Sequence, residues 1–265
     1  MVSLIDNANA SGTPYILLVL GGFVLAGFMS IIAALVGTIV NNEEKRDRRT
    51  VNVVRYAYKT INLSLTKFTH FVRCARRRTA EQNIGSVLDF QTEVVREIYG
   101  LLEHEYGEGE FLEERIDFEV TFITKSYKDH ELTIASWANK DGRAPKSLAA
   151  RELNPLLYRD TEADKLYNDP NHSVRIIART SAKEYKELYP GQKTRIKSSI
   201  IYPVFRDDSN LEGVIVAHCD KEDFFRDRER KFWSELLDIY AKRLALCRAV
   251  TTELVNSAGM DCGPY

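Results

Sequence analysis

An uncharged stretch near the amino terminus constrains this chain more than any other feature. No charged side chain occurs from Asn7 to Asn42, and Tyr15 to Val40 is almost wholly apolar. A helix rises ~1.5 Å per residue, so this run would reach about 39 Å, more than the ~30 Å of a hydrocarbon core. The sequence therefore predicts a single transmembrane helix at 15–40, preceded by a short extracytoplasmic segment at 1–14.

A buried core helix and a cleaved signal peptide are the alternatives to this membrane span. Core helices rarely run so far without a charge, and a signal peptide needs a positively charged start and a shorter apolar run. Residues 1–14 contain no Lys or Arg, whereas the opposite flank is basic. Positive charge stays on the cytoplasmic side. We therefore predict an inner-membrane protein with its N-terminus outside and residues 41–265 in the cytoplasm, where scattered, unpaired cysteines are expected.

Small residues recur every fourth position along the predicted membrane helix. Such a stripe lets two helices approach closely in lipid, although small residues are also common in membrane helices generally. It predicts a homodimer or higher oligomer in contact with membrane lipid. The predicted helix-packing residues are Gly22, Ala26, Ser30, Ala34 and Thr38.

The net charge of −1 hides a basic neck at 41–80 and an acidic remainder, with net charges of +8 and −8. Apolar residues in the neck follow a heptad spacing over three repeats, which predicts a helix. This helix could be an intermolecular coiled coil or could pack on its own domain. No aromatic residues interleave with the basic cluster at 73–78, so we expect no nucleic-acid binding. The heptad residues are Val51, Val54, Tyr58, Ile61, Leu65, Phe68 and Val72.

The remainder, 81–250, predicts a cytoplasmic domain built from an antiparallel sheet with helices packed on it, an α+β fold. Its apolar residues change from a period of 3.6 to a period of two and back. Pro203 predicts an edge or a bulge, because proline donates no ladder hydrogen bond. The tail at 251–265 is expected to be loose. The predicted elements, in order, are a helix at 81–106, a hairpin at 118–137, a strand at 174–180, a hairpin at 198–219 and a helix from Asp227.

The stretch from Lys197 to Leu246 resembles the C-terminal half of a GAF domain. It has a strand with a serine and a proline, a turn, a glycine-led apolar strand, a phenylalanine and an acidic helix start. The matching residues are Ser198, Pro203, Gly213, Phe225 and Asp227. The hairpin at 118–137 suits the first two strands of that family.

This resemblance implies a small-molecule sensor and dimerisation module, with a pocket between the sheet and the irregular middle region. The cyclic-nucleotide signature of the family is incomplete, because Asp220 stands in place of its Asn and Arg228 in place of its Asp. This departure argues against a cyclic nucleotide and leaves the cofactor or ligand unidentified. The candidate ligand-binding residues are Trp137, Arg143, Tyr158, Tyr167, Arg175, Arg179, Ser198, Tyr202 and His218.

No catalytic motif and no metal-binding spacing is found among the five histidines and four cysteines, so no enzyme activity and no metal site are predicted. The leading hypothesis is a membrane-tethered cytoplasmic GAF-like sensor or scaffold that binds a small ligand or partner and passes the signal through helix packing to another protein. The alternative is a single-span membrane effector, as in some bacterial antiviral systems. In that case the cytoplasmic domain senses a signal and the membrane helices cluster to disrupt the bilayer.

Overall fold

The computed structural model describes most of the chain from 79 to 258, with short gaps. The predicted membrane helix at 15–40, its packing residues and nearly all of the neck lie outside the described residues. Among the residues described, no helix is both long and apolar enough to cross a bilayer. The described residues are 56, 59, 66, 67, 79–107, 115–126, 130–154, 156–169, 171–181, 185–206 and 210–258.

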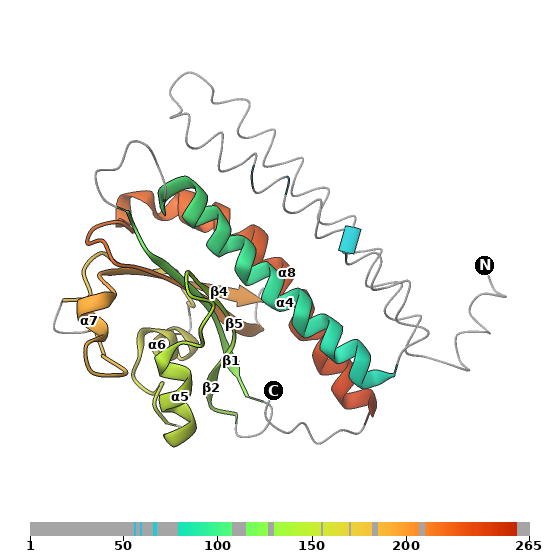
Figure 1. The fold of residues 1–265 in the computed structure, drawn as a ribbon. Coiled ribbons are helices and arrows are strands. Elements are labelled where there is room, and N and C mark those ends of the chain that lie inside the picture. Colours follow the sequence, from blue (N-terminus) through green and yellow to red (C-terminus); the bar gives the residue numbers. More distant parts are fainter. Residues whose placement is uncertain are drawn as a thin grey trace. The chain divides into compact units, whose positions relative to one another are not determined.

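Five antiparallel strands form one sheet in the order β2-β1-β5-β4-β3 (Figure 1). The two hairpins expected from the alternating pattern are present, and β1 pairs with β5 to join them in the centre. The predicted α+β class is therefore confirmed. The strands are β1 (Phe118–Lys125), β2 (Leu132–Asn139), β3 (Arg175–Ile177), β4 (Ser198–Phe205) and β5 (Leu211–Cys219).

Pro203 lies where the sequence predicts it, at an open position of the sheet. Although β4 lies between β5 and β3, the three-residue strand β3 pairs only with Ser199, Ile200 and Ile201. Pro203 lies beyond the end of that pairing and is aligned only with Val214 of β5, so the β3 side of the strand needs no N–H from it. The register with β5 also shifts just after it, between Val204 and Phe205.

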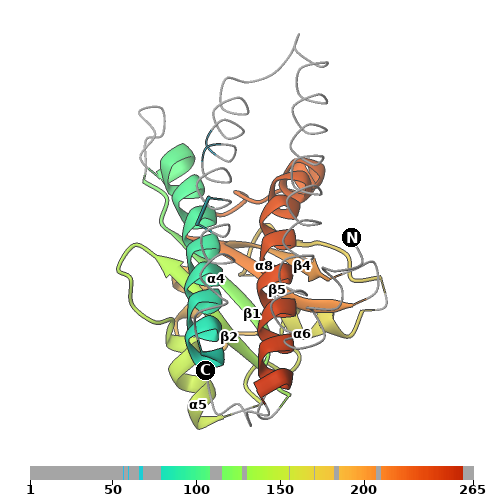
Figure 2. The same ribbon diagram turned by 90° about the vertical axis from the view of Figure 1, so that its right-hand side faces the viewer.

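Helices cover both faces of the sheet, as Figures 1 and 2 show. The parts of α4 and α8 at 89–102 and 230–249 share a compact unit with the sheet and cover one face. On the other face, Ala163 and Leu166 of α6 are buried against Ile201 and Val216. The helices are α4 (Ala80–Leu102), α5 (Lys146–Leu153), α6 (Glu162–Tyr167), α7 (Gln192–Arg195) and α8 (Arg230–Ala258); η2 (Glu103–Gly107) continues α4 as a π-helical turn and η3 (Asp227–Glu229) precedes α8.

The end of α8 corrects one expectation. The sequence predicts a loose tail from 251, but the helix continues to Ala258. Thr251, Leu254 and Val255 are buried, so the stripe that buries the earlier part of the helix continues past Val250. Residues 250–258 belong, with 79–88, to a second compact unit.

A buried ion pair connects α4 to α8. Arg243 of α8 is 2% exposed, and both of its terminal nitrogens donate to the carboxylate of Glu97 of α4, Nη2 to Oε1 at 3.1 Å. The guanidinium also lies over the rings of Phe90 and Tyr240, at 5.4 Å and 5.9 Å from their centroids. A two-bond arginine–carboxylate pair fixes both distance and orientation. It therefore sets the register of one helix against the other.

Candidate ligand-binding site on the sheet

A row of polar side chains crosses four neighbouring strands at one level of the sheet. In the register, Asn139 of β2 is paired with Glu119 of β1, Glu119 with His218 of β5, and His218 with Ser199 of β4. Paired residues lie on the same face of a sheet, and alternate residues of a strand share a face. The row therefore lies on the face that carries Ile201 and Val216, which is the face covered by α6. We call these four residues the polar row.

The polar row is half-buried at Asn139 and His218 and buried at its other two members, which is unusual for such side chains in the middle of a sheet. Ser199 is fully buried and Glu119 is 8% exposed. Ser199 Oγ and His218 Nδ1 are 2.6 Å apart, and Arg195 Nη2 of α7 donates to Glu119 Oε2 at 3.1 Å. A buried charge is costly unless it is paired and hydrogen-bonded. A simple hydrophobic layer would carry none of these groups, so the row points to binding.

Burial shifts the proton affinity of the two titratable groups in the row. It raises the pKa of the Glu119 carboxyl, against the smaller lowering effects of Arg195 and a hydrogen bond from Asn139. It lowers the pKa of His218 to about 4, with a further contribution from the positive charge of Arg195. His218 is therefore neutral at pH 7 and can both donate and accept a hydrogen bond.

Two groups at the margin of the row are available to a ligand. The side-chain amide of Asn139 donates to the backbone oxygen of Arg143 at 2.8 Å, while its own oxygen, Oδ1, is buried without a hydrogen-bond partner among the described residues. The side chain of Arg195 is 51% exposed although one of its nitrogens is paired with Glu119. One acceptor and one half-exposed donor thus flank the row. A small polar molecule with groups of both kinds would match them.

Five of the nine predicted ligand residues lie on the face of the polar row. His218 belongs to the row itself. Trp137 is on β2, two residues before Asn139, and is partly buried. Tyr158 is 3% exposed and packs with the apolar cluster of that face, as does Tyr167. Arg175 lies on β3, but its guanidinium already forms ion pairs with the carboxylates of Glu162 and Asp169, at 3.2 Å each.

The side chains of the other four predicted residues are not brought to the row, although the backbone oxygen of Arg143 accepts from Asn139. Arg143 is exposed, and Arg179 is 61% exposed and paired with Asp223. Strand alternation places Ser198 and Tyr202 on the opposite face from Ser199 and Ile201.

The opposite-face residues have structural partners of their own. The Ser198 hydroxyl donates to the Ile177 oxygen at 3.0 Å and accepts from the Phe225 amide at 3.1 Å. The Tyr202 hydroxyl donates to Asp238 of α8 at 3.4 Å.

Sequence reasoning missed Asn139, Glu119, Ser199 and Arg195. Glu119 alternates with Phe118 and Val120, and the simplest interpretation of that pattern is a solvent-facing acid. The sequence gives no direct signal for the row, because β1 and β5 are far apart in the chain and no turn links them.

Thiol and metal chemistry have no support among the described residues. Cys219 and Cys247 are both buried, and burial raises the pKa of each thiol to about 12, so neither forms the reactive thiolate near neutral pH. Cys219 follows His218 directly and so points to the opposite face of β5. No cluster of three or more His, Cys, Asp or Glu side chains that could hold a metal ion occurs in the described parts of the chain.

The pKa of His218 predicts how stability depends on pH. The pKa of His218 is 6.5 in the unfolded chain and about 4 in the folded one. Between these two pH values the unfolded chain binds a proton that the folded chain does not, so the protein loses stability as the pH drops. We expect His218 to account for a loss of about 2 kcal/mol between pH 7 and pH 5. The raised pKa of Glu119 acts in the opposite direction, since its protonation favours the folded state.

Replacement of His218 isolates its effect from that of Glu119. His218→Gln should remove that loss, so that the variant's stability falls less than wild type between pH 7 and pH 5 in urea unfolding followed by circular dichroism. His104→Gln, whose side chain is 67% exposed, is the control and should keep the wild-type slope. Equal slopes for wild type and His218→Gln would contradict the assignment.

Known protein families and curated proteins give no match to this chain. Several solved structures resemble it. They include a free methionine-R-sulfoxide reductase from Neisseria meningitidis, 16% identical with a TM-score of 0.40 over 64% of this chain and 90% of that one. A putative GAF sensor protein from Burkholderia vietnamiensis is 14% identical with a TM-score of 0.41 over 64% and 93%. The PixJ GAF domain of Thermosynechococcus elongatus is 14% identical with a TM-score of 0.41 over 65% and 94%.

GAF domains are among the structures that resemble the chain, as the resemblance of the stretch from Lys197 to Leu246 led us to expect. At these identities and TM-scores the similarity carries no conclusion about what this chain binds or does. The expectation that this chain is not an enzyme stays a prediction.

Proposed function

We propose that this protein is a membrane-tethered sensor whose GAF-like domain binds a small polar molecule at the polar row. The observation that carries the proposal is the buried to half-buried row of Asn139, Glu119, His218 and Ser199 across four strands. Cores exclude such groups unless something satisfies them. The unpartnered Asn139 oxygen and the half-exposed Arg195 favour a ligand that both donates and accepts hydrogen bonds.

The sheet offers a direct mechanical route from this site to the helices of its other face. Ser199 of the row is flanked in β4 by Ser198, whose hydroxyl binds the backbone of both Ile177 and Phe225. Phe225 is fully buried and precedes α8 by five residues. A ligand that draws Ser199 toward it would therefore shift the start of α8, and the Arg243–Glu97 pair would carry that shift to α4. The receiver of the signal is another protein.

The membrane tether rests on the uncharged run at 15–40 and on the basic flank that follows it. We propose a single-pass protein of the inner membrane, with the GAF-like domain in the cytoplasm and with membrane helices that associate through their small residues. In this arrangement α4 follows the neck directly, since it begins at Ala80.

Ligand binding is tested by thermal unfolding of the full chain in mild detergent, with and without adenine and guanine nucleotides, amino acids and di- and tricarboxylic acids. We expect at least one of these classes to raise the Tm by several degrees. The rise should be lost in Glu119→Gln and kept in the control Lys231→Gln, whose side chain is 90% exposed on α8. A flat response across the set, or equal responses in wild type and Glu119→Gln, would contradict the proposed site.

The membrane tether is tested separately by fractionation and protease access. The full chain should sediment with membranes and resist carbonate extraction, and a C-terminal tag should be cleaved by protease only after the cells are opened. A chain that stays in the supernatant after ultracentrifugation would overturn the tether but leave the ligand site standing. Leakage of a membrane-impermeant dye on expression would instead favour the effector alternative.

A further inference from the structure

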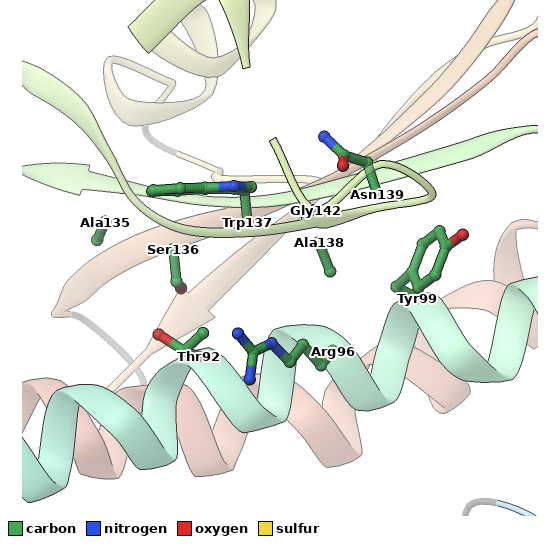
Figure 3. A pocket seen from close by; sticks show the side chains of 9 residues that line it. All are labelled: Thr92, Arg96, Tyr99, Ala135, Ser136, Trp137, Ala138, Asn139 and Gly142. Atoms are coloured by element: carbon green, nitrogen blue, oxygen red, sulfur yellow. The ribbon is translucent and has the colours of Figure 1, made fainter. Parts of the chain in front are cut away.

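A groove runs between α4 and the outer edge of β2, on the face opposite to the polar row. Its volume is about 530 Å³. Figure 3 shows Thr92, Arg96 and Tyr99 on the α4 side, with Ser136 and Ala138 directed from β2 toward the helix. Trp137 and Asn139 point away from α4 in the same view. The groove is thus framed by one helix and one strand, the arrangement in which proteins accept an extended peptide.

The edge of β2 is open to another strand. β2 pairs with β1 on one side only. At its ends, the Leu132 oxygen accepts from Arg151 and the Asn139 oxygen accepts from the Gly142 amide. Between them, at 133–138, the described part of the chain offers no main-chain partner other than β1.

Natural edge strands are commonly protected by charged residues, proline, a bulge or short length. The eight residues of β2 include neither a charged residue nor a proline, whereas the other edge strand, β3, has only three residues. The one irregularity of β2 is the register shift opposite Phe122 and Ile123, which sets Ala135 apart. Beyond that shift the pairing with β1 is regular from Ser136 to Asn139, and the groove follows this part of the strand.

Arg96 is the one charged side chain among the described residues that line the groove. Arg96 is exposed and forms no ion pair or hydrogen bond within the described residues. Thr92, Arg96 and Tyr99 are spaced by four and three, so they lie on one face of α4 and extend about 10 Å along it. Alternate side chains of a strand are ~7 Å apart, so two side chains of an added strand would lie along this face. A carboxylate on one of them would meet the guanidinium of Arg96.

We propose that the groove binds an extended, acidic peptide segment of a partner protein, which adds to β2 as a sixth strand and pairs a carboxylate with Arg96. This is a second binding site, beyond the ligand site of the polar row, and it would give the proposed sensor a surface on which a partner protein docks. Main-chain hydrogen bonds to 133–138 give affinity, and Arg96 gives the preference for acidic segments.

The test uses the full chain in mild detergent and three fluorescein-labelled peptides. The first is acetyl-Thr-Val-Glu-Val-Glu-Val-Thr-amide, the second carries Lys in place of both Glu residues, and the third is the acidic peptide with alternate main-chain nitrogens methylated. Fluorescence anisotropy should show saturable binding of the acidic peptide and at least tenfold weaker binding of the other two. Amide hydrogen exchange at 133–138 should slow when the acidic peptide is added.

Charge variants separate the groove from general electrostatic attraction. Arg96→Glu should weaken binding of the acidic peptide at least tenfold and improve binding of the Lys peptide, and Arg96→Gln should give an intermediate affinity. Lys231→Glu makes the same charge change on α8 and should leave affinity within twofold.

Several outcomes would overturn the peptide site. They are no binding of the acidic peptide, equal binding of the acidic and methylated peptides, unchanged affinity in both Arg96 variants, or a concentration-dependent dimer that protects 133–138 without peptide. None of these bears on ligand binding at the polar row, because that response is measured with small molecules and with Glu119→Gln.

Discussion

Arg243→Met is expected to lower the free energy of unfolding by about 3–5 kcal/mol, the largest effect of any single change considered for this protein. The substitution keeps a long side chain between α4 and α8 but leaves the carboxylate of Glu97 buried without its cation. Glu97 is 7% exposed, so water cannot replace the lost partner. Urea unfolding of the full chain in detergent, followed by circular dichroism at 222 nm, measures the loss.

The matched experiment removes both charges together. Glu97→Leu combined with Arg243→Met takes the buried carboxylate away, and replacement of a buried ion pair by apolar residues is often neutral or stabilising. The double variant should therefore be more stable than Arg243→Met alone. If the double variant loses as much as or more than the single one, the helices depend on Arg243 through its packing on Phe90 and Tyr240 rather than through its charge.

Gly213→Ala is expected to be the second most damaging change, with a loss of about 1–3 kcal/mol. A Cβ at this position of β5 would lie 2.4 Å from Phe122 Cε2 and 2.8 Å from the backbone oxygen of Ile123. Phe122 is fully buried, so its ring has nowhere to move without displacing its neighbours. The backbone oxygen can yield only if β1 and β5 separate. The same urea titration measures this loss.

Gly85→Ala is the control for the glycine substitution, and the opposite sign is expected. A Cβ at Gly85 would meet nothing within 4 Å, and the position lies inside α4. Alanine in a helix interior is favoured over glycine by roughly 0.5–1 kcal/mol. Gly85→Ala should therefore stabilise the protein slightly. A destabilised Gly85→Ala together with an unaffected Gly213→Ala would contradict the packing described around Phe122.

The strands were largely predictable from the sequence because each alternates or is bounded by a polar turn. The hairpin of β1 and β2 has its turn between Lys125 and Leu132, and β4 begins and ends at the predicted residues, Ser198 and Phe205. Pro203 was interpreted correctly because its constraint is local: a residue without an N–H needs an open position wherever it lies. The end of α8 was misjudged because Thr251 and Thr252 break the apolar pattern only briefly, and Leu254 and Val255 resume it.

The site was less predictable, since it depends on pairing rather than on pattern. Glu119, His218 and Ser199 come from three strands, and only the register of β1 with β5 and of β4 with β5 aligns them. The turn of the hairpin fixes the register of β4 with β5, but no turn fixes the register of β1 with β5. His218 was selected for its chemistry alone. Ser198 was preferred to Ser199 on the family resemblance, and strand alternation places only Ser199 on the face of the row.

The central pairing of β1 with β5 also sets the order of events during synthesis. Phe118 of β1 is paired with Cys219 of β5, about a hundred residues later in the chain. The sheet therefore cannot form completely until β5 has left the ribosome. The apolar run at 15–40 emerges long before that. Insertion into the bilayer, where it occurs, thus precedes folding of the domain. A nascent chain stalled before residue 211 would then carry an inserted anchor and an unfinished sheet with β1 exposed to chaperones.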